Sequence, residues 1–390
     1  MYKYKCLNPI AACGLENFSD QYVKVEEAEP ADMILVRSAK MHDMEFDPEL
    51  KAIARAGAGV NNIPLDRCAE QGIVVFNTPG ANANGVKELF IFAAIAGLRD
   101  IMGGVAWTKS EAGNPDIAAL TEKEKKKFVG HEILGKTLGV IGLGAIGVKV
   151  ANVAVELGMK VIGYDPYLSD AAKLALNSAV KTTDDLDEVA KAADLITIHV
   201  PAMDSTNGMI NAAYIEKMKD GVIVINLARD TLVNEPDMAA ALEAGKVAKY
   251  VCDFPTEGAS KMKNTILIPH LGASTEESED NCAIMAVQEL TDFMENGNIK
   301  NSVNYPNADL GPVKGCRLTV AHKASVSAAD IQELLKPFGA VVVDMISKTR
   351  GDYAYSMFEI GGCSCSSSSC SELEEKIKAD GILKVRIISK

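Results

Sequence analysis

The segment Gly142-Leu143-Gly144-Ala145-Ile146-Gly147 constrains the fold of this chain more than any other stretch. An apolar run, residues 137–141, precedes it, and a helical pattern over residues 148–157 follows it. Asp165 closes the next apolar run, 21 residues after Gly144. A strand, a glycine-rich turn, a helix and a second strand that ends in an acid are the signature of a dinucleotide-binding βαβ unit. The pattern predicts a doubly wound, mostly parallel sheet.

Each position of this glycine-rich segment has an expected role. The first glycine, Gly142, permits a tight turn, and the second, Gly144, lets the backbone approach a pyrophosphate. The helix that opens there directs free N–H groups at the phosphates. The expected phosphate-binding residues are Gly142, Gly144, Ala145, Ile146 and Gly147. A glycine turn that serves only helix–sheet packing is the alternative.

Asp165 predicts which dinucleotide binds. Its carboxylate can accept hydrogen bonds from ribose hydroxyls, and it would repel a 2′-phosphate. Pro166 and Tyr167, which follow it, supply no cation to offset that repulsion. We therefore expect NAD in preference to NADP.

The alternation of short apolar runs with helical stretches predicts two Rossmann-like parallel-sheet domains. We expect a substrate-binding domain over residues 1–88, completed by a returning segment at 276–304. We expect the NAD-binding Rossmann domain over residues 89–275. The apolar spacing predicts one helix from residue 86 to about 107 and another from 276 to 296.

The C-terminal part of the chain has a different order of elements. Residues 305–315 contain prolines, glycines and an asparagine, and they are predicted to form a linker. After them, residues 316–390 show the order strand, helix, strand, strand, helix, strand. This is the ferredoxin-like βαββαβ order, so we expect a separate small domain.

Charge and hydropathy exclude two classes of partner. The 390 residues carry a formal net charge of −13, whereas a nucleic-acid surface needs a basic face. The longest apolar run, residues 89–98, is shorter than the about 20 residues that span a bilayer, so we expect no membrane partner. Nine cysteines without a leader sequence are typical of reduced thiols, which predicts a cytoplasmic protein.

Three later apolar runs each end in a polar residue that suits hydride-transfer chemistry. The first ends at Arg229, the second near Asp253 and Glu257, and the third at His270. Oxidation of a secondary alcohol needs a base for the hydroxyl proton, and histidine titrates near working pH. An arginine can hold the neighbouring carboxylate with two hydrogen bonds. Alternatively, Arg229 is an ordinary surface residue and His270 is a structural histidine.

With these residues the sequence resembles the D-isomer-specific 2-hydroxyacid dehydrogenase family. The likeness covers residues 31–306 and rests on RAGAGVNNI, GIVVFNTPGANANGVKEL, LGVIGLGAIG, INLAR and PHLGAST. VRSAK, NGNIKNSVNYP and an ACT-type C-terminal domain are most similar to members that oxidise 3-phosphoglycerate to 3-phosphohydroxypyruvate in serine biosynthesis. Dehydrogenation of another D-2-hydroxy acid is one alternative. A non-catalytic NAD-sensing protein or a pure amino-acid-binding regulator is less consistent with the set of polar residues.

The resemblance implies roles for particular residues. Arg229, Glu257 and His270 match the catalytic arginine, the glutamate that pairs with the histidine, and the histidine itself. The further cofactor-binding positions are Pro201, Ala228, Asp253, His270, Gly272 and Ala273. The substrate-binding positions are Arg37, Ser38, Ala58, Gly59, Asn82, Arg229 and His270. The substrate is expected to be a small phosphorylated hydroxy acid, with no metal, and the protein a homodimer or homotetramer.

The sequence departs from the family pattern near the site. Asp230 stands where the family usually has glycine, and Lys87 replaces a small residue. Cys252 occupies the commonest acidic position, which places Asp253 one residue away from it. The cluster Lys123–Lys127 is a candidate to bind the substrate phosphate.

The ACT-type domain departs from its pattern too. His322 is kept, but Ala324 stands where an asparagine would help to bind serine, and Ser327 and Ala328 stand near an expected Pro-Gly pair. We therefore expect weak or no inhibition by serine. The segment GGCSCSSSSC carries Cys363, Cys365 and Cys370, which suggest either a soft-metal or redox site or, more simply, a serine-rich loop.

Overall fold

The computed structural model describes residues 1–361, 377 and 379–389. These residues form two compact units. Unit 1 contains residues 1–82 and 276–390, and unit 2 contains residues 83–275. The chain therefore leaves unit 1 once and returns to it at residue 276. The boundary expected near residue 88 falls inside a helix, and the units divide before that helix begins.

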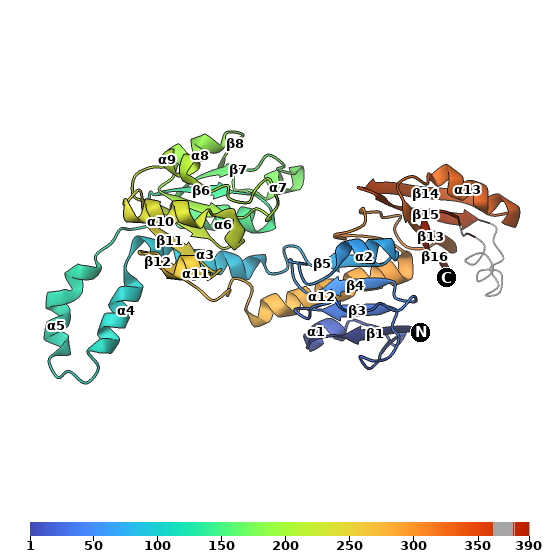
Figure 1. Ribbon diagram of the computed structural model, residues 1–390, viewed down its shortest axis with the longest axis horizontal. Helices are drawn as coiled ribbons and strands as arrows, with labels where there is room; N and C mark the ends of the chain where they lie inside the picture. Colours follow the sequence, from blue (N-terminus) through green and yellow to red (C-terminus); the bar gives the residue numbers. More distant parts are fainter. Residues whose placement is uncertain (362–376, 378, 390) are drawn as a thin grey trace. The chain divides into compact units, whose positions relative to one another are not determined.

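Unit 2 is built on a seven-stranded parallel sheet with the order β12-β11-β10-β9-β6-β7-β8 (Figure 1). The strands are β6 (Thr137–Ile141), β7 (Lys160–Tyr164), β8 (Lys181–Thr183), β9 (Leu195–Ile198), β10 (Val222–Asn226), β11 (Val247–Cys252) and β12 (Thr265–Leu267). The strand order reverses between β6 and β9, which is where dinucleotides bind in such sheets. The predicted doubly wound Rossmann sheet is confirmed.

The helices of unit 2 are α3 (Ala83–Leu98), α4 (Ile101–Ser110), α5 (Ile117–Glu124), α6 (Ala145–Glu156), α7 (Asp170–Ala175), α8 (Leu186–Ala192), α9 (Ala212–Glu216), α10 (Glu235–Glu243) and α11 (Glu257–Ser260), with single turns η1 (Lys125–Phe128) and η2 (Asp230–Leu232). Helices pack on both faces of the sheet, whereas α4 and α5 project away from it (Figure 1). One apolar core contains Phe90 of α3 and Ala151 of α6. The other contains Val189 of α8, Tyr214 of α9 and Met238 of α10. The buried strands contribute to both cores, as central parallel strands do.

The helix predicted from residue 86 to about 107 is divided in the structure. α3 and α4 meet at a 75° bend, and the Asp100 side chain caps α4 by accepting a hydrogen bond from the Gly103 N–H. A capping side chain offers the backbone an alternative to continuing the helix. Among the described residues no single helix is long and apolar enough to cross a membrane, and only α3 and α4 counted together would be.

The first part of unit 1 is a five-stranded parallel sheet with the order β2-β1-β3-β4-β5. Its strands are β1 (Tyr2–Cys6), β2 (Tyr22–Lys24), β3 (Met33–Val36), β4 (Ala52–Arg55) and β5 (Val74–Asn77). The helices are α1 (Ala12–Leu15), α2 (Leu65–Glu70) and the long α12 (Glu276–Asn296), whose bounds match the prediction. α12 ends where Gly297 adopts a φ of 74°, a left-handed conformation that suits glycine.

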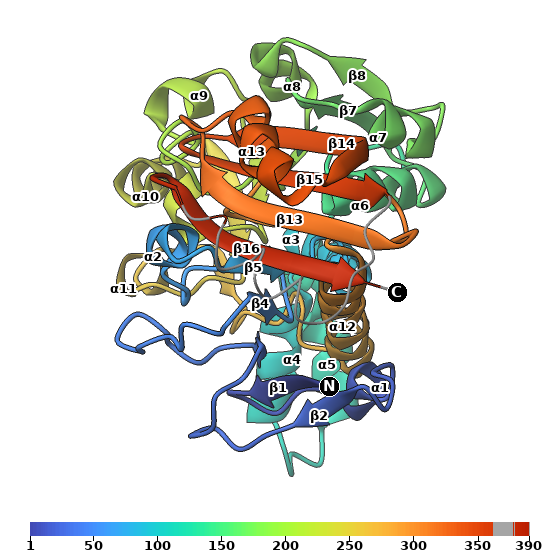
Figure 2. The ribbon, with the colours of Figure 1, turned by 90° about the vertical axis from the view of Figure 1, so that its right-hand side faces the viewer.

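The C-terminal part is a four-stranded antiparallel sheet with the order β14-β15-β13-β16 (Figure 2). Its strands are β13 (Cys316–Lys323), β14 (Val341–Arg350), β15 (Tyr353–Gly361) and β16 (Ile382–Ser389), and α13 (Ala328–Leu335) with the turn η3 (Lys336–Phe338) follows β13. This strand order is the ferredoxin-like one. The second helix expected there, and Cys363, Cys365 and Cys370, lie outside the described residues.

The C-terminal sheet packs against the end of α12. The core of unit 1 includes Tyr355 and Met357 of β15 together with Phe293 of α12. The Tyr355 hydroxyl donates to the Gly297 carbonyl at 2.8 Å, and the Arg386 guanidinium donates to the Met294 carbonyl at 3.0 Å. These donors satisfy carbonyl groups that a helix end leaves without partners. The predicted linker is itself ordered, since Tyr305 is fully buried.

Candidate functional site

The expected cofactor-binding residues of unit 2 follow the carboxyl ends of its strands. β6 leads into the glycine-rich turn, and β7 leads to Asp165. β9 leads to Pro201, β10 to Ala228, and β11 and β12 to the later polar residues. Parallel strands end at the same edge of a sheet, so residues spread over more than 130 positions of the sequence converge there. This edge is the candidate cofactor site.

The three glycines of the turn differ in whether a side chain would fit at their positions. Gly142 has a φ of 92°, and a β-carbon there would lie 2.6 Å from the His199 carbonyl oxygen. A β-carbon on Gly147 would lie 1.9 Å from the Gly142 carbonyl oxygen. A β-carbon on Gly144 would meet no atom within 4 Å. Gly142 and Gly147 are thus required by the fold, whereas Gly144 faces open space that a pyrophosphate can occupy.

The start of α6 and Asp165 complete the expected dinucleotide-binding unit. α6 begins at Ala145 with no side-chain cap, so its first N–H groups remain available to an anion. The Asp165 carboxylate accepts from the Leu143 N–H at 2.8 Å and from the Tyr167 N–H at 2.8 Å. These bonds fix the carboxylate beside the glycine-rich turn, where it can accept from ribose hydroxyls.

Phe254 brings the two catalytic candidates of unit 2 together. The rings of Phe254 and His270 have centroids 4.5 Å apart, and the Arg229 guanidinium carbon lies 5.7 Å from the Phe254 centroid. His270 has a φ of 50°, a conformation that is uncommon outside glycine and is found at functional sites. The imidazole and the guanidinium therefore lie around one aromatic ring.

Asp253 is a buried carboxylate close to both His270 and Arg229. It is 1% exposed, and its Oδ2 accepts from the Gly272 N–H at 3.2 Å. Burial raises the pKa of the Asp253 carboxyl, and the charges of His270 and Arg229 oppose that rise. Its other oxygen, Oδ1, is buried and has no hydrogen-bond partner among the described residues. A buried acceptor without a partner fits the amide donor of a nicotinamide, so the residues present fit NAD.

The structure does not join Glu257 to His270. The Glu257 side chain is 86% exposed, and its carboxylate pairs with the Lys261 ammonium at 2.6 Å, one turn along α11. The pairing of Glu257 with His270 therefore stays a prediction. The remaining cofactor candidates, Pro201 and Ala273, lie in loops that follow β9 and β12.

The substrate-binding candidates of unit 1 lie at the carboxyl edge of its parallel sheet. Arg37 and Ser38 follow β3, and Ala58 and Gly59 follow β4. The Asn8 side chain accepts hydrogen bonds from the backbone N–H groups of Arg37, Ser38 and Ala39 at 2.9–3.0 Å. Three donors on one oxygen hold this loop in a single conformation. Asn82 lies just before α3, and its side-chain oxygen is buried without a partner among the described residues.

Arg55, at the end of β4, is a second cation beside Arg37. Its Nε donates to the Arg37 carbonyl at 3.1 Å, and its guanidinium lies over Gly57, where a β-carbon would be 1.5 Å from Nη1. Arg37 forms an ion pair with Glu279 of α12 at 2.5 Å. Two guanidinium groups thus lie at this edge, with one carboxylate paired to Arg37.

The residues that depart from the family pattern make local contacts. Asp230 opens the turn η2, and Lys87 on α3 donates to the Asn84 side chain at 2.6 Å. In the lysine cluster, Lys125 pairs with Glu122 and Lys127 pairs with Glu124.

His322 is fully buried, and both its ring nitrogens are engaged, by the Lys323 carbonyl at 2.9 Å and the Ser356 hydroxyl at 2.8 Å. It therefore has no free ring nitrogen for an anionic ligand in this structure. Ser327 caps α13 in a reciprocal arrangement with Asp330, and Ala328 is the first residue of that helix.

Comparison with known proteins identifies the family. A model of the NAD-binding domain of D-isomer specific 2-hydroxyacid dehydrogenases matches residues 91–272. Hydroxypyruvate reductase of Thermotoga maritima is 38% identical over 271 residues, which are 66% of this chain and 83% of that protein. The chain belongs to the D-isomer specific 2-hydroxyacid dehydrogenase family. Unit 2 is accordingly the NAD-binding domain of a 2-hydroxyacid dehydrogenase.

Other 2-hydroxyacid dehydrogenases support this placement. D-3-phosphoglycerate dehydrogenase of Methanocaldococcus jannaschii is 36% identical over 292 residues, 73% of this chain and 53% of that protein. The NAD⁺-bound structure of 3-phosphoglycerate dehydrogenase from Entamoeba histolytica is 26% identical, with a TM-score of 0.60, and the match covers 78% of this chain and 98% of that one. The chain spans about half the length of several curated phosphoglycerate dehydrogenases that it matches.

Sequence reasoning missed three residues that lie at these candidate sites. Phe254 follows Asp253 directly, and an aromatic residue between two acidic candidates was a usable signal. Arg55 lies at the end of an apolar run, as Arg229 does. The search for polar residues at the ends of apolar runs, which found Arg229, would therefore have found Arg55 as well. Asn8 had no local signal, because its three partners are about 30 residues away.

Proposed function

We propose that this protein catalyses the NAD-dependent oxidation of 3-phosphoglycerate to 3-phosphohydroxypyruvate, the first step of serine synthesis. The observation that carries the proposal is the pair of guanidinium groups, Arg37 and Arg55, at the carboxyl edge of the unit 1 sheet. A substrate with a carboxylate and a phosphate needs more cations than a simple hydroxy acid does. The curated relatives named D-3-phosphoglycerate dehydrogenase, 36% identical, support the same substrate.

In this proposal each catalytic residue has one task. His270 accepts the proton of the substrate hydroxyl, and Arg229 holds the carboxylate with two hydrogen bonds. Phe254 keeps the imidazole and the guanidinium in fixed positions, since both contact its ring. Asp253 stays buried, and its Oδ1, which has no partner among the described residues, would accept a hydrogen bond from the nicotinamide amide. NAD, when bound, supplies the hydride acceptor.

Reduction of hydroxypyruvate or a similar unphosphorylated acid is the second candidate. It is favoured by the hydroxypyruvate reductase of Thermotoga maritima, whose length the chain covers more fully, at 83%. The two candidates differ only in the phosphate. They are therefore distinguished by the arginines of unit 1 and not by the catalytic residues.

A substrate panel tests the proposal. Purified protein is given NAD with 3-phosphoglycerate, D-glycerate, D-lactate or D-2-hydroxyglutarate, and NADH is followed by absorbance. We expect the highest kcat/KM with 3-phosphoglycerate, and we expect Arg37→Met and Arg55→Met to lower it more than they lower kcat/KM for D-glycerate. A higher kcat/KM for any unphosphorylated acid would show that the phosphate assignment is wrong.

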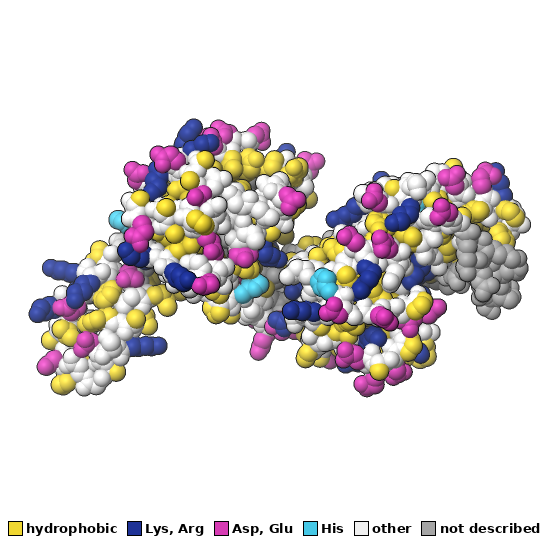
Figure 3. All heavy atoms as spheres, viewed as in Figure 1, with side chains coloured by type: hydrophobic (Ala, Val, Ile, Leu, Met, Phe, Trp, Pro, Cys, Tyr) yellow, Lys and Arg dark blue, Asp and Glu magenta, His cyan; other side chains and the backbone are white. Residues whose placement is uncertain are grey.

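We also propose that the protein is a homodimer or homotetramer. Figure 1 shows α4 and α5 projecting from the rest of unit 2, and neither helix has a buried residue. Ile101, Met102 and Val105 of α4 are 40–46% exposed. In Figure 3 hydrophobic side chains lie along this helical pair, with Lys and Arg side chains around them. An apolar helix of this kind suits a second copy of the chain.

Light scattering after size exclusion measures the mass directly. We expect a multiple of 41.5 kDa for the wild type and a smaller mass for Val105→Glu. A monomeric wild-type protein would refute this part of the proposal.

A further inference from the structure

Three buried polar side chains lie together at the carboxyl ends of β10 and β11. Asn226 is the last residue of β10, and Tyr250 and Cys252 belong to β11. The two strands are parallel neighbours, with Asn226 opposite Cys252 in the register. The three residues are 0%, 3% and 1% exposed, respectively. None of the catalytic roles proposed above uses these side chains.

The Asn226 amide is bonded to the backbone of the loop that carries Arg229. Its Oδ1 accepts from the Ala228 N–H at 3.1 Å, and its Nδ2 donates to the Arg229 carbonyl at 2.8 Å. The Asn226 backbone carbonyl accepts from the Asp253 N–H at 3.3 Å. A buried amide that the backbone satisfies on both sides holds that backbone in one conformation. Asn226 therefore fixes the point from which the Arg229 side chain extends.

The Cys252 thiol is bonded to the backbone of Phe254 in the same way. Its Sγ accepts from the Phe254 N–H at 3.2 Å and donates to the Phe254 carbonyl at 3.5 Å. Burial raises the pKa of the Cys252 thiol to about 11, although hydrogen bonds from Tyr250 and from the Phe254 backbone oppose the rise. The thiol thus stays protonated at neutral pH, where it can donate and accept at once.

Tyr250 joins these two side chains. The Asn226 Nδ2 also donates to the Tyr250 hydroxyl at 3.4 Å, and that hydroxyl is hydrogen-bonded to the Cys252 side chain. The network therefore connects the loop after β10 to the loop after β11. These are the loops whose side chains meet, since the Arg229 guanidinium carbon lies 5.7 Å from the Phe254 ring centroid.

We propose that Asn226 and Cys252, joined through Tyr250, are positioning residues that set where the Arg229 guanidinium and the Phe254 ring lie. The inference rests on the proposed role of Arg229 in holding the substrate carboxylate. Two hydrogen bonds to a carboxylate need a guanidinium in one place and orientation, and a shift of about 1 Å in a binding group can cost much of the rate. The alternative is a network that only stabilises the sheet.

Steady-state kinetics of Asn226→Ala, with the best substrate of the panel, tests the first arm of the network. We expect kcat/KM for the hydroxy acid to fall at least about tenfold, mainly through a higher KM, while the KM for NAD stays near the wild-type value. Asn234→Ala is the matched control, because it removes the same amide from the N-cap of α10 in the same unit. The control should lower the melting temperature and leave both KM values unchanged.

The thiol arm has its own variants. Cys252→Ala removes the acceptor for the Phe254 N–H and should lower kcat/KM at least about threefold. Cys252→Ser keeps a hydroxyl acceptor there and should regain most of that loss. Tyr250→Phe keeps the ring and removes only the joining hydroxyl, so it repeats the test in a protein that folds if Asn226→Ala does not. Wild-type kcat/KM in Asn226→Ala, or in both Cys252→Ala and Tyr250→Phe, overturns the proposal.

A double-mutant cycle separates positioning from stability. If Asn226 acts through Arg229, Asn226→Ala should change kcat/KM less than about twofold once Arg229→Met is present. An equal loss in both backgrounds means that Asn226 only stabilises the fold, and it overturns the proposal. If Arg229→Met itself leaves the KM unchanged, the proposed role of Arg229 fails and the positioning role fails with it. If Arg229→Met raises the KM and Asn226→Ala does not, the positioning role alone fails.

Discussion

Glu289 on α12 should make the stability of unit 1 fall as the pH rises. Its side chain is buried, with 7% of the residue exposed. The Asn301 side chain donates to its Oε1 at 2.7 Å, while Oε2 has no hydrogen-bond partner among the described residues. Burial raises the pKa of this carboxyl from 4.5 to about 8, and the bond from Asn301 opposes the rise only in part.

The size of the effect follows from the two pKa values. Between pH 4.5 and 8 the folded protein keeps the Glu289 proton, while the unfolded chain releases it. Because the folded state binds more protons, its stability falls by about 1.4 kcal/mol for each pH unit in this window. From pH 5.5 to 7.5 this gives about 2 to 3 kcal/mol. Glutamine keeps the shape and the bond to Asn301 without this titration.

Glu289→Gln should therefore gain stability over the wild type as the pH rises. Urea unfolding is followed by circular dichroism at pH 5.5 and 7.5, and the difference in free energy of unfolding between the two proteins is taken at each pH. We expect that difference to move by about 2 to 3 kcal/mol in favour of the variant. Glu277→Gln, on the exposed side of the same helix, is the control and should show no such change. Equal differences at both pH values for Glu289→Gln would refute the reasoning.

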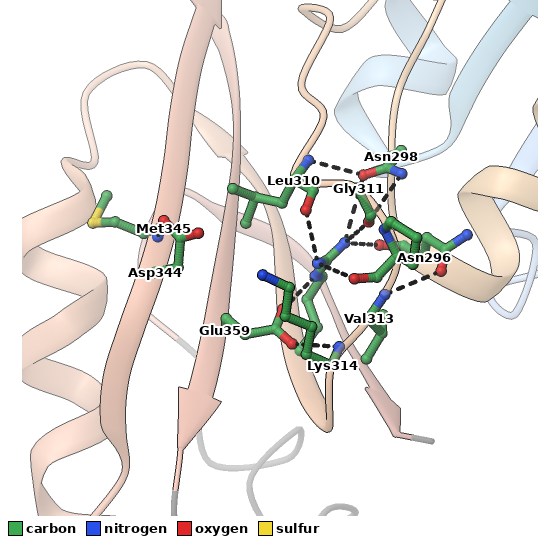
Figure 4. Close-up of polar contacts among 12 residues, drawn as sticks. Asn296, Asn298, Leu310, Gly311, Val313, Lys314, Asp344, Met345 and Glu359 are labelled. Atoms are coloured by element: carbon green, nitrogen blue, oxygen red, sulfur yellow. Dashed lines mark hydrogen bonds and ion pairs between the residues drawn. The ribbon is translucent and has the colours of Figure 1, made fainter.

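Four further perturbations test other parts of the molecule. His270→Ala should lower kcat by about 10²–10⁴-fold while NADH binding, measured by fluorescence titration, stays near the wild-type value; an unchanged kcat would remove His270 from the mechanism. Asp165→Ala should shift the ratio of kcat/KM for NAD and NADP toward NADP, and a fixed ratio would mean that Asp165 does not contact the ribose. Arg317→Met leaves Glu359 as a buried charge without its partner (Figure 4) and should lower the free energy of unfolding by about 3–5 kcal/mol. Adding Glu359→Gln should restore part of that loss, and a double variant no more stable than Arg317→Met alone would contradict this account. Serine, titrated into the initial-rate assay, should inhibit weakly or not at all, because the methyl group of Ala324 offers no hydrogen bond to it, and half-inhibition at micromolar serine would contradict this expectation.

The glycine-rich turn could be predicted from sequence because its constraints are local. The order strand, turn, helix and strand occupies one continuous stretch, residues 137–165, and the structure places β6, α6 and β7 there. The bounds of α12 were predicted equally well, since an apolar face at helical spacing ends at Gly297. Arg229 and His270 could be found by one rule, that polar residues after parallel strands meet at one edge of the sheet.

The contacts of those residues depend on packing between distant segments. Nothing near Arg229 in the sequence predicts that it lies over Phe254, 25 residues later, or that Asp253 is buried beneath. The resemblance pairs Glu257 with His270, and the structure adds a contact that the resemblance does not imply: the exposed Glu257 carboxylate pairs with the Lys261 ammonium at 2.6 Å. The bend between α3 and α4 depended on a single capping side chain, Asp100, in a pattern that otherwise predicts one helix.

What the sequence by itself determined is the α/β fold class, the dinucleotide-binding turn and the bounds of α12, because periodicity and glycine geometry act over a few residues. What only the tertiary structure decided is where the charges are satisfied. Arg317 finds Glu359, 42 residues away, and Arg386 finds the end of α12, more than 90 residues away. A buried charge needs partners, and the fold brings these partners from distant parts of the chain. The spacing of residues in the sequence therefore does not predict which partners they are.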